Sequence, residues 1–121
     1  MAANQLLSKR LASPDESRTF PLGRVDLVTL AGATIGLATM EPGWKWSESV
    51  KPLARTETCQ VGHTGYMVSG RLHIKMADGA ESEIGPGEAF AIAPGHDAWV
   101  VGSEPAVNID FAGAAVFAAA L

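Results

Sequence analysis

The chain has 121 residues, a length typical of one domain that buries its own hydrophobic core. Hydrophobic residues make up 47% of the chain and charged residues only 18%, which excludes an intrinsically disordered protein. The net charge is −4, and no basic run accompanies the aromatic residues, which argues against nucleic acid as a partner. We therefore expect a mildly acidic globular protein whose partners are small molecules or other proteins.

Cysteine content and hydropathy bear on the compartment. The single cysteine, Cys59, cannot form an internal disulfide, so nothing indicates an oxidising environment and we expect a cytoplasmic protein. In residues 1–11 the basic side chains follow the apolar ones, the reverse of the order in a secretory signal. The longest apolar run, residues 111–121, is about half as long as the ~20 residues of a membrane-spanning helix. We expect no membrane association.

The first part of the chain divides into an arm and the start of a sheet. Residues 1–21 are polar and mixed, and we assign them to an N-terminal arm that precedes a single domain over residues 22–121. From Val25 onward, short apolar runs are separated by glycine and proline, as in a sheet protein with many turns. The first predicted strands are Val25–Leu30, Thr34–Met40, Trp44–Val50 and Thr56–Val61.

Alternation and turn signals define the later strands. Two half-buried strands with a pivot at Ser69-Gly70 are predicted from apolar residues that all occupy even-numbered positions. These residues are Tyr66, Val68, Leu72, Ile74 and Met76. Asp78-Gly79 predicts a hairpin turn because both residues tolerate positive φ, and Gly85-Pro86-Gly87 predicts a second turn. Phe90 and Ile92 then alternate inward. Two later strands are predicted: one begins at Trp99–Val101, and the last contains the alternating residues Val107, Ile109 and Phe111.

This pattern of short strands and tight turns, with almost no helix, predicts an all-β double-sheet jelly roll or small barrel. An immunoglobulin-like sandwich is the alternative on pattern alone, although the paired cysteines of the antibody type are missing.

Three potential metal donors lie close together in the sequence at Glu57, Cys59 and His63. On an extended strand, Glu57 and Cys59 would point to the same face, and a turn at Gly62 would bring His63 beside them. A carboxylate, a thiol and an imidazole that converge in a barrel interior could bind a transition metal. The competing interpretations are a solvated Glu57, a Cys59 that only packs in the core, and a loop histidine.

Two further segments, residues 62–72 and 85–95, resemble the cupin family in the right order. The first corresponds to the family's "YVLSGRL"-like strand, and the second to its "PGDxxxIPPG" motif. The resemblance covers roughly residues 41–111. It implies a double-stranded β-helix (jelly-roll) barrel with an internal metal or ligand site, and a homodimer as the oligomeric state.

The resemblance also aligns the candidate ligands. Glu57 and Cys59 stand where the family usually has histidines, and His63 stands where it usually has glutamate. The last ligand position of the second motif is occupied by Ala98, and His96, two residues earlier, shares its face on a continuous strand. Glu57, Cys59, His63 and His96 are therefore the predicted ligands of a divalent transition metal such as zinc, iron, nickel or manganese.

Aromatic residues predict a mostly apolar pocket, with Trp46, Tyr66 and Trp99 as its candidate lining, although core filling is the commoner role of such side chains.

Two functions remain open. One is a metal-dependent oxygenase, isomerase or lyase that acts on a small organic molecule, with catalytic residues that the sequence does not identify. The other is a non-catalytic module that binds or senses a small molecule without metal. Metal-free acid–base catalysis by His63 or His96 is a weaker third possibility.

Overall fold

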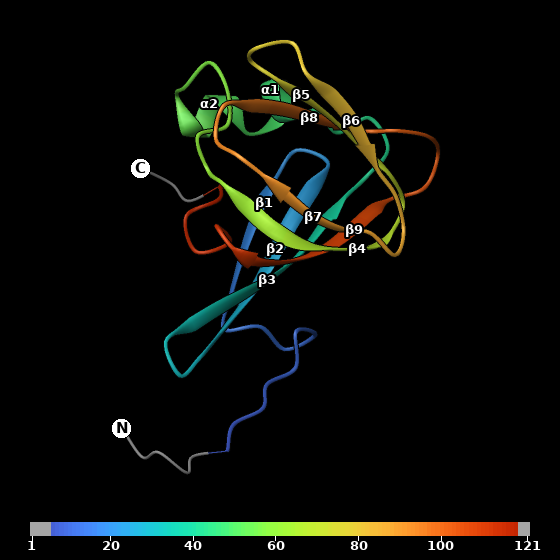
Figure 1. Cartoon of the computed structure of the whole chain (residues 1–121). Coiled ribbons are helices and arrows are strands. Elements are labelled where there is room, and N and C mark those ends of the chain that lie inside the picture. The colour runs from blue at the N-terminus through green and yellow to red at the C-terminus, as the bar shows by residue number, and fades with distance from the viewer. Residues whose placement is uncertain (1–5, 119–121) are drawn as a thin grey trace.

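The computed structural model describes residues 6–118, which form two antiparallel sheets and two short helices (Figure 1). The larger sheet has the order β1 (Glu16–Phe20), β2 (Gly23–Leu30), β3 (Ala33–Met40), β9 (Ala106–Ala112), β4 (His63–Ser69), β7 (Ala89–Ile92). The smaller sheet has the order β6 (Glu81–Ile84), β5 (Leu72–Met76), β8 (His96–Val100). The predicted all-β, cupin-like jelly roll is confirmed.

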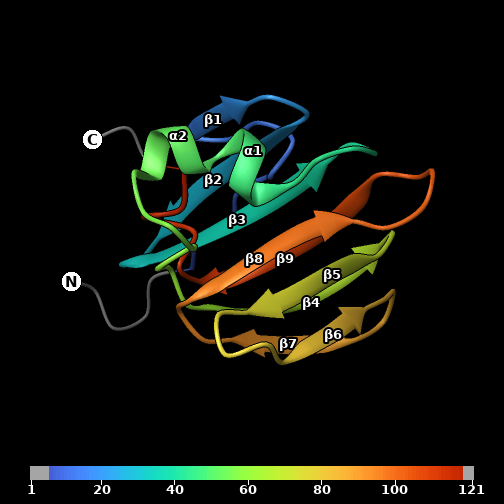
Figure 2. The same ribbon diagram turned by 90° about the horizontal axis from the view of Figure 1, so that it is seen from above.

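The two sheets enclose the hydrophobic core. Seen from above, the smaller sheet overlies β9, β4 and β7, and the two helices overlie β2 and β3 (Figure 2). Strand residues with alternate burial supply the core, because successive side chains of a strand point to opposite faces. Its members come from both sheets and include Val25, Leu27, Met40, Met67, Leu72 and Ile74.

The helix α1 (Trp46–Ser49) occupies the segment for which a strand over Trp44–Val50 is predicted, so that prediction is wrong; α2 (Lys51–Ala54) follows directly. Trp46 and Val50 are four residues apart, which places them on the same side of a helical turn, and both are 1% exposed. Pro52 lies in the first turn of α2, where its missing N–H leaves no helical hydrogen bond unmade. None of the described helices is long and apolar enough to span a bilayer.

The faces of β4 are the reverse of those predicted. Met67 is fully buried, whereas Tyr66 and Val68 are 42% and 45% exposed, although the inward side chains of β5 are Leu72 and Ile74 as expected. The pairing of β4 with β9 shifts register between Met67 and Ser69, and Gly70 follows with φ of 74°. This irregularity changes the parity between the two strands, so a single alternation cannot run through both.

Two other predictions concern the ends of strands. The hairpin turn at Asp78-Gly79 is confirmed, since it joins the antiparallel strands β5 and β6 and Gly79 has φ of 96°. Residues 16–20 of the predicted N-terminal arm form β1, which pairs with β2 at the edge of the larger sheet. This part of the arm therefore belongs to the sheet.

Candidate metal centre and cavity

Cys59, His63 and His96 converge inside the barrel. One donor atom from each side chain lies within 4.8 Å of the others, and Cys59 Sγ is 3.9 Å from His63 Nε2. Cys59 and His96 are 2% and 3% exposed, so the group is almost closed to solvent. The structure thus brings together three of the four predicted ligands.

Backbone hydrogen bonds fix the relative positions of Cys59 and His96. The Cys59 N–H donates to the His96 carbonyl oxygen at 2.7 Å, and the Gly95 N–H donates to the Cys59 carbonyl oxygen at 2.7 Å. Cys59 therefore forms an isolated bridge to the start of β8 and is not part of a longer strand. His63 is the first residue of β4, whose partner strand at this point is β7.

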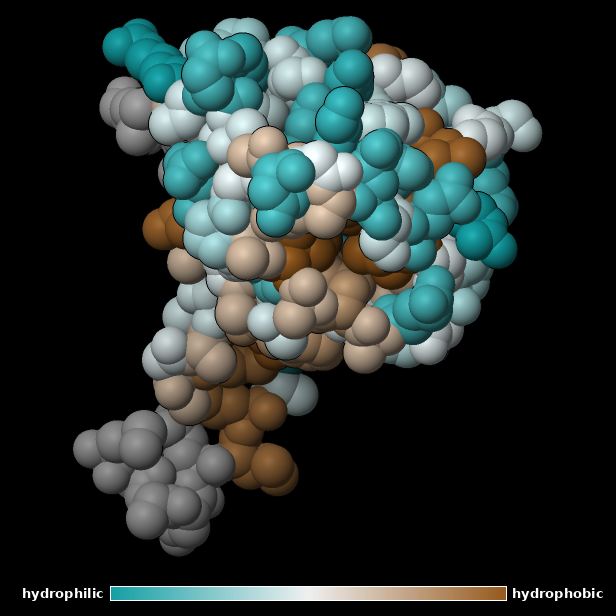
Figure 3. All heavy atoms as spheres, turned by 45° about the horizontal axis from the view of Figure 1, so that its top comes forward, coloured by the Kyte–Doolittle hydropathy of each residue, from teal (hydrophilic) through white to brown (hydrophobic). Residues whose placement is uncertain are grey.

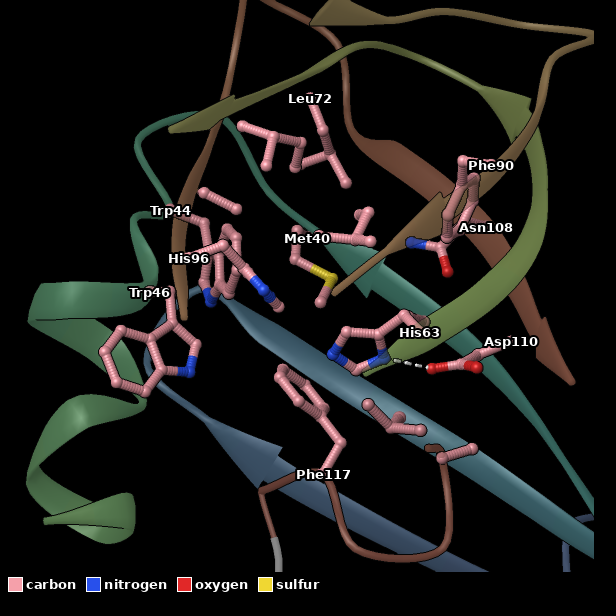
Figure 4. Close-up of a pocket in the computed structure, with 16 residues that line it drawn as sticks. Met40, Trp44, Trp46, His63, Leu72, Phe90, His96, Asn108, Asp110 and Phe117 are labelled. Carbon is pink, nitrogen blue, oxygen red and sulfur yellow. Dashed lines mark hydrogen bonds and ion pairs between the residues drawn. The ribbon is translucent and has the colours of Figure 1, made fainter. Parts of the chain in front are cut away.

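Each histidine is oriented by a hydrogen bond to its Nδ1. Asp110 Oδ2 lies 2.5 Å from His63 Nδ1, and the Ala93 carbonyl oxygen lies 2.8 Å from His96 Nδ1 (Figure 4). Acceptors at both Nδ1 atoms favour the tautomer with a proton there, which leaves the Nε2 lone pairs available to a ligand. This arrangement of a carboxylate or carbonyl behind the imidazole is characteristic of metal-binding histidines.

The site also favours an ionised cysteine. Burial acts to raise the pKa of the Cys59 thiol, but hydrogen bonds with His63 and His96 lower it to about 6. Burial likewise acts to lower the pKa of His63, but Asp110 and Cys59 raise it to about 9. At neutral pH the metal-free site therefore contains a thiolate beside an imidazolium, and the thiolate is the form that binds metals.

The donor set fits a divalent transition metal. Tetrahedral coordination by sulfur and nitrogen places these atoms about 3.5 Å apart, close to the 3.9 Å between Cys59 Sγ and His63 Nε2. One sulfur and two nitrogen donors leave a fourth position open for water or substrate, as in catalytic zinc sites. Thiolate and imidazole together suit zinc, iron or nickel better than manganese.

Glu57 does not join this group. Its side chain is 93% exposed, and its carboxylate pairs with Lys51 Nζ at 3.0 Å on the surface. The prediction that Glu57 and Cys59 share a face assumes a strand over residues 56–61, but this segment contains bends and only one bridging residue. Arg55, with φ of 59°, ends α2 in a left-handed conformation and redirects the chain before Glu57.

A cavity of about 50 Å³ adjoins the histidines (Figure 4). Its polar lining consists of His63, His96, Asn108 and Asp110, and most of the remaining lining is aliphatic or aromatic. Trp46, one of the candidate pocket residues, is among the residues that line the cavity. The volume is enough for a few water molecules or a compact ligand.

The other two predicted pocket residues lie elsewhere. Tyr66 faces outward from β4, as described above. Trp99 also faces outward, because the buried residues of β8 are His96, Ala98 and Val100. Its ring stacks on His73 with centroids 4.6 Å apart, and Lys45 Nζ lies 5.1 Å from its centroid.

Sequence reasoning missed Asp110 and Asn108. In β9 the inward residues are Ala106, Asn108 and Asp110, whereas the more conspicuous apolar alternation belongs to the outward face. The available signal was two polar side chains of equal parity in an otherwise apolar strand. A buried carboxylate needs a partner, which is a reason to look for a histidine opposite it.

A second hollow of about 340 Å³ lies where β6 and β7 form the facing edges of the two sheets. Ile74, Phe90 and Ile92 line both this groove and the inner cavity, so the two spaces adjoin at these side chains. Figure 3 shows apolar side chains in a hollow in the middle of one face, below a mostly hydrophilic region.

No family model matches the sequence, and no curated protein resembles it in sequence. Solved structures do resemble the fold. A DUF1255 protein of unknown function from Acidithiobacillus ferrooxidans is 22% identical, with 90% of this chain and 96% of that chain covered and a TM-score of 0.58. A protein of unknown function from Rhizobium leguminosarum is 23% identical, with coverage of 88% and 94% and a TM-score of 0.58.

A third similar structure is described as a member of the cupin superfamily. It is a sugar phosphate isomerase of the cupin superfamily from Silicibacter pomeroyi, 18% identical, with coverage of 86% of this chain and 73% of that chain and a TM-score of 0.60. At these identities the likeness establishes architecture alone. Together with the motifs in residues 62–72 and 85–95, it shows that this chain has the cupin fold.

Proposed function

We propose that Cys59, His63 and His96 bind one divalent transition metal ion and that the adjoining cavity binds a small organic molecule. The observation that carries this proposal is the convergence of the three donors with Asp110 hydrogen-bonded behind His63. When bound, such an ion would polarise an oxygen of the ligand or activate a water molecule. A metal-dependent enzyme of the oxygenase, isomerase or lyase type is the function that this arrangement supports best.

The chain's own residues would have separate roles. Cys59 and His96 provide donors whose spacing is set by the backbone bridge, and His63 provides a donor whose ring is held by Asp110. The apolar cavity wall excludes bulk water, which strengthens polar interactions with a bound molecule.

Cobalt titration of the metal-free protein tests the metal site. We expect one ion per chain and a thiolate-to-cobalt absorption band, because Cys59 is the only cysteine. Cys59→Ser should abolish the band, and His63→Ala should weaken binding strongly. His73→Ala is the matched control, since His73 stacks on Trp99 outside the cavity.

A non-catalytic module that binds a small molecule without metal is the alternative. In that case ligands should raise the melting temperature equally with and without a chelator, and metal analysis of the purified protein should show no stoichiometric ion. Cobalt binding that survives Cys59→Ser with an unchanged spectrum would contradict the proposed site.

A further inference from the structure

The charge of a divalent ion at the candidate site would be balanced by side chains of the site itself. The two positive charges of a divalent ion would be matched by the Cys59 thiolate and the Asp110 carboxylate. Among the described residues that line the cavity, none is a lysine or arginine. An anionic molecule would therefore be buried without a counter-charge, which is strongly unfavourable.

Two side chains with hydrogen-bond donors border the cavity, and one of them, Trp44, has no partner for its indole N–H in the described part of the chain. Trp44 is 3% exposed, and its indole N–H is buried and unpaired. Asn108 is 6% exposed, and its side chain also lines the cavity. A buried indole N–H usually has a partner, and a side-chain amide offers two N–H donors, so both groups are suited to contact a bound molecule.

The two groups flank the histidines. Figure 4 shows Trp44 beside His96 on one side of the cavity and Asn108 above His63 on the other. All four side chains line the same cavity. A molecule that contacts the open metal position would therefore lie within the space that Trp44 and Asn108 border.

We infer that the cavity binds an uncharged, compact molecule with a carbonyl or hydroxyl oxygen, to which the Trp44 indole and the Asn108 amide donate hydrogen bonds. This inference rests on the proposed function, which places the substrate in this cavity. The volume of about 50 Å³ limits the substrate to a few heavy atoms unless side chains move. Phosphorylated and carboxylated substrates are disfavoured because neither the cavity nor the β6–β7 groove is lined by a lysine or arginine, and the charge of His63 is already matched by Asp110.

Acetamide and acetate form a nearly isosteric pair that tests this inference on the metal-free protein. The chain has three tryptophans, whose indole N–H signals can be assigned in nitrogen–proton NMR spectra from Trp→Phe variants. We expect acetamide to shift the Trp44 indole signal saturably and acetate to bind at least tenfold more weakly. Equal or tighter binding of acetate, or an unshifted Trp44 signal at saturating acetamide, would overturn the inference.

Variants separate the two hydrogen bonds. Trp44→Phe keeps an aromatic ring but removes the donor, and Asn108→Leu keeps the shape but removes the amide. Each should weaken acetamide binding by about 3- to 10-fold, as measured from the chemical shifts of cavity-lining backbone amides. Trp99→Phe, which lies outside the cavity, should leave acetamide binding unchanged.

These outcomes are independent of the metal. If Trp44→Phe and Asn108→Leu both bind acetamide as tightly as the parent protein, the assigned hydrogen-bonding role is wrong even if cobalt binds at Cys59. Conversely, selective binding of acetamide in a protein that binds no cobalt would support this subsite and contradict the proposed metal centre.

Discussion

Asp110→Asn tests whether the buried carboxylate sets the charge and the tautomer of His63. Burial acts to lower the pKa of His63, but Asp110 and Cys59 outweigh this effect and raise the pKa from 6.5 to about 9. This rise corresponds to about 3 kcal/mol in favour of the imidazolium. Asparagine retains the Oδ1 acceptor that receives the Ala112 N–H at 3.0 Å, so the substitution removes the charge with little change of shape.

The stability effect should depend on pH. Because the folded-state pKa of His63 is raised, its stabilisation is fully present below pH 6.5 and disappears as pH rises through about 9. We expect Asp110→Asn to lower the free energy of unfolding by about 2 kcal/mol in mildly acidic solution. The difference from the parent protein should shrink towards zero at alkaline pH, as measured by urea unfolding at a series of pH values.

The same substitution should weaken metal binding about 10- to 100-fold, because the asparagine amide would face Nδ1 and favour the tautomer with a proton on Nε2. Competition with a chromophoric chelator measures this effect. Asp26→Asn is the control, since it removes another buried carboxylate that is bonded to Ser17 and Arg24, away from the site. Unchanged metal affinity in Asp110→Asn, or a stability loss that is the same at all pH values, would refute the reasoning.

Three further predictions address the rest of the structure. The alkylation rate of metal-free Cys59 should rise through pH 6 and then level off, because its pKa is lowered to about 6; a rise centred near pH 9 would contradict this. Arg18→Ala should cost about 1–2 kcal/mol in urea unfolding, since Arg18 donates to the Ala114 and Phe117 carbonyl oxygens at 3.2 and 3.0 Å. The exposed Arg10→Ala is its control, and equal effects would exclude this role. Gly65→Ala should cost about 3 kcal/mol or more, because its Cβ would collide with the Ile109 carbonyl oxygen, whereas at Gly62 the nearest atom is 3.4 Å away. Similar melting temperatures for the two glycine variants would show that the collision is relieved.

The strand content and the order of the motifs were predictable because hydrophobic alternation and glycine-containing turns are local signals. The hairpin at Asp78-Gly79 and the pivot at Ser69-Gly70 follow from the φ values that these sequences favour. The inward faces of β4 and β9 were not predictable in the same way. A register shift beside Ser69 and the demand for a partner to His63 depend on strands that are distant in sequence.

The candidate ligands likewise divide into residues that the sequence could predict and residues that only the tertiary structure identifies. His63 and Cys59 could be proposed from their spacing and from the motif, and His96 from its shared face with Ala98. Glu57 failed because the parity argument requires a continuous strand, whereas the chain bends after Arg55. Asp110 and Trp44 acquire their roles only from tertiary contacts, and no spacing in the sequence relates them to the histidines.

The construction of the site implies that metal binding is not needed for folding. Cys59 and His96 are positioned by backbone hydrogen bonds between a loop and β8, and His63 is positioned by Asp110 of the adjacent strand β9. These contacts and the core drawn from both sheets are made by protein groups alone. Small zinc domains, by contrast, fold only when the metal supplies the missing stability. We therefore expect chelators to remove the ion while the barrel stays folded.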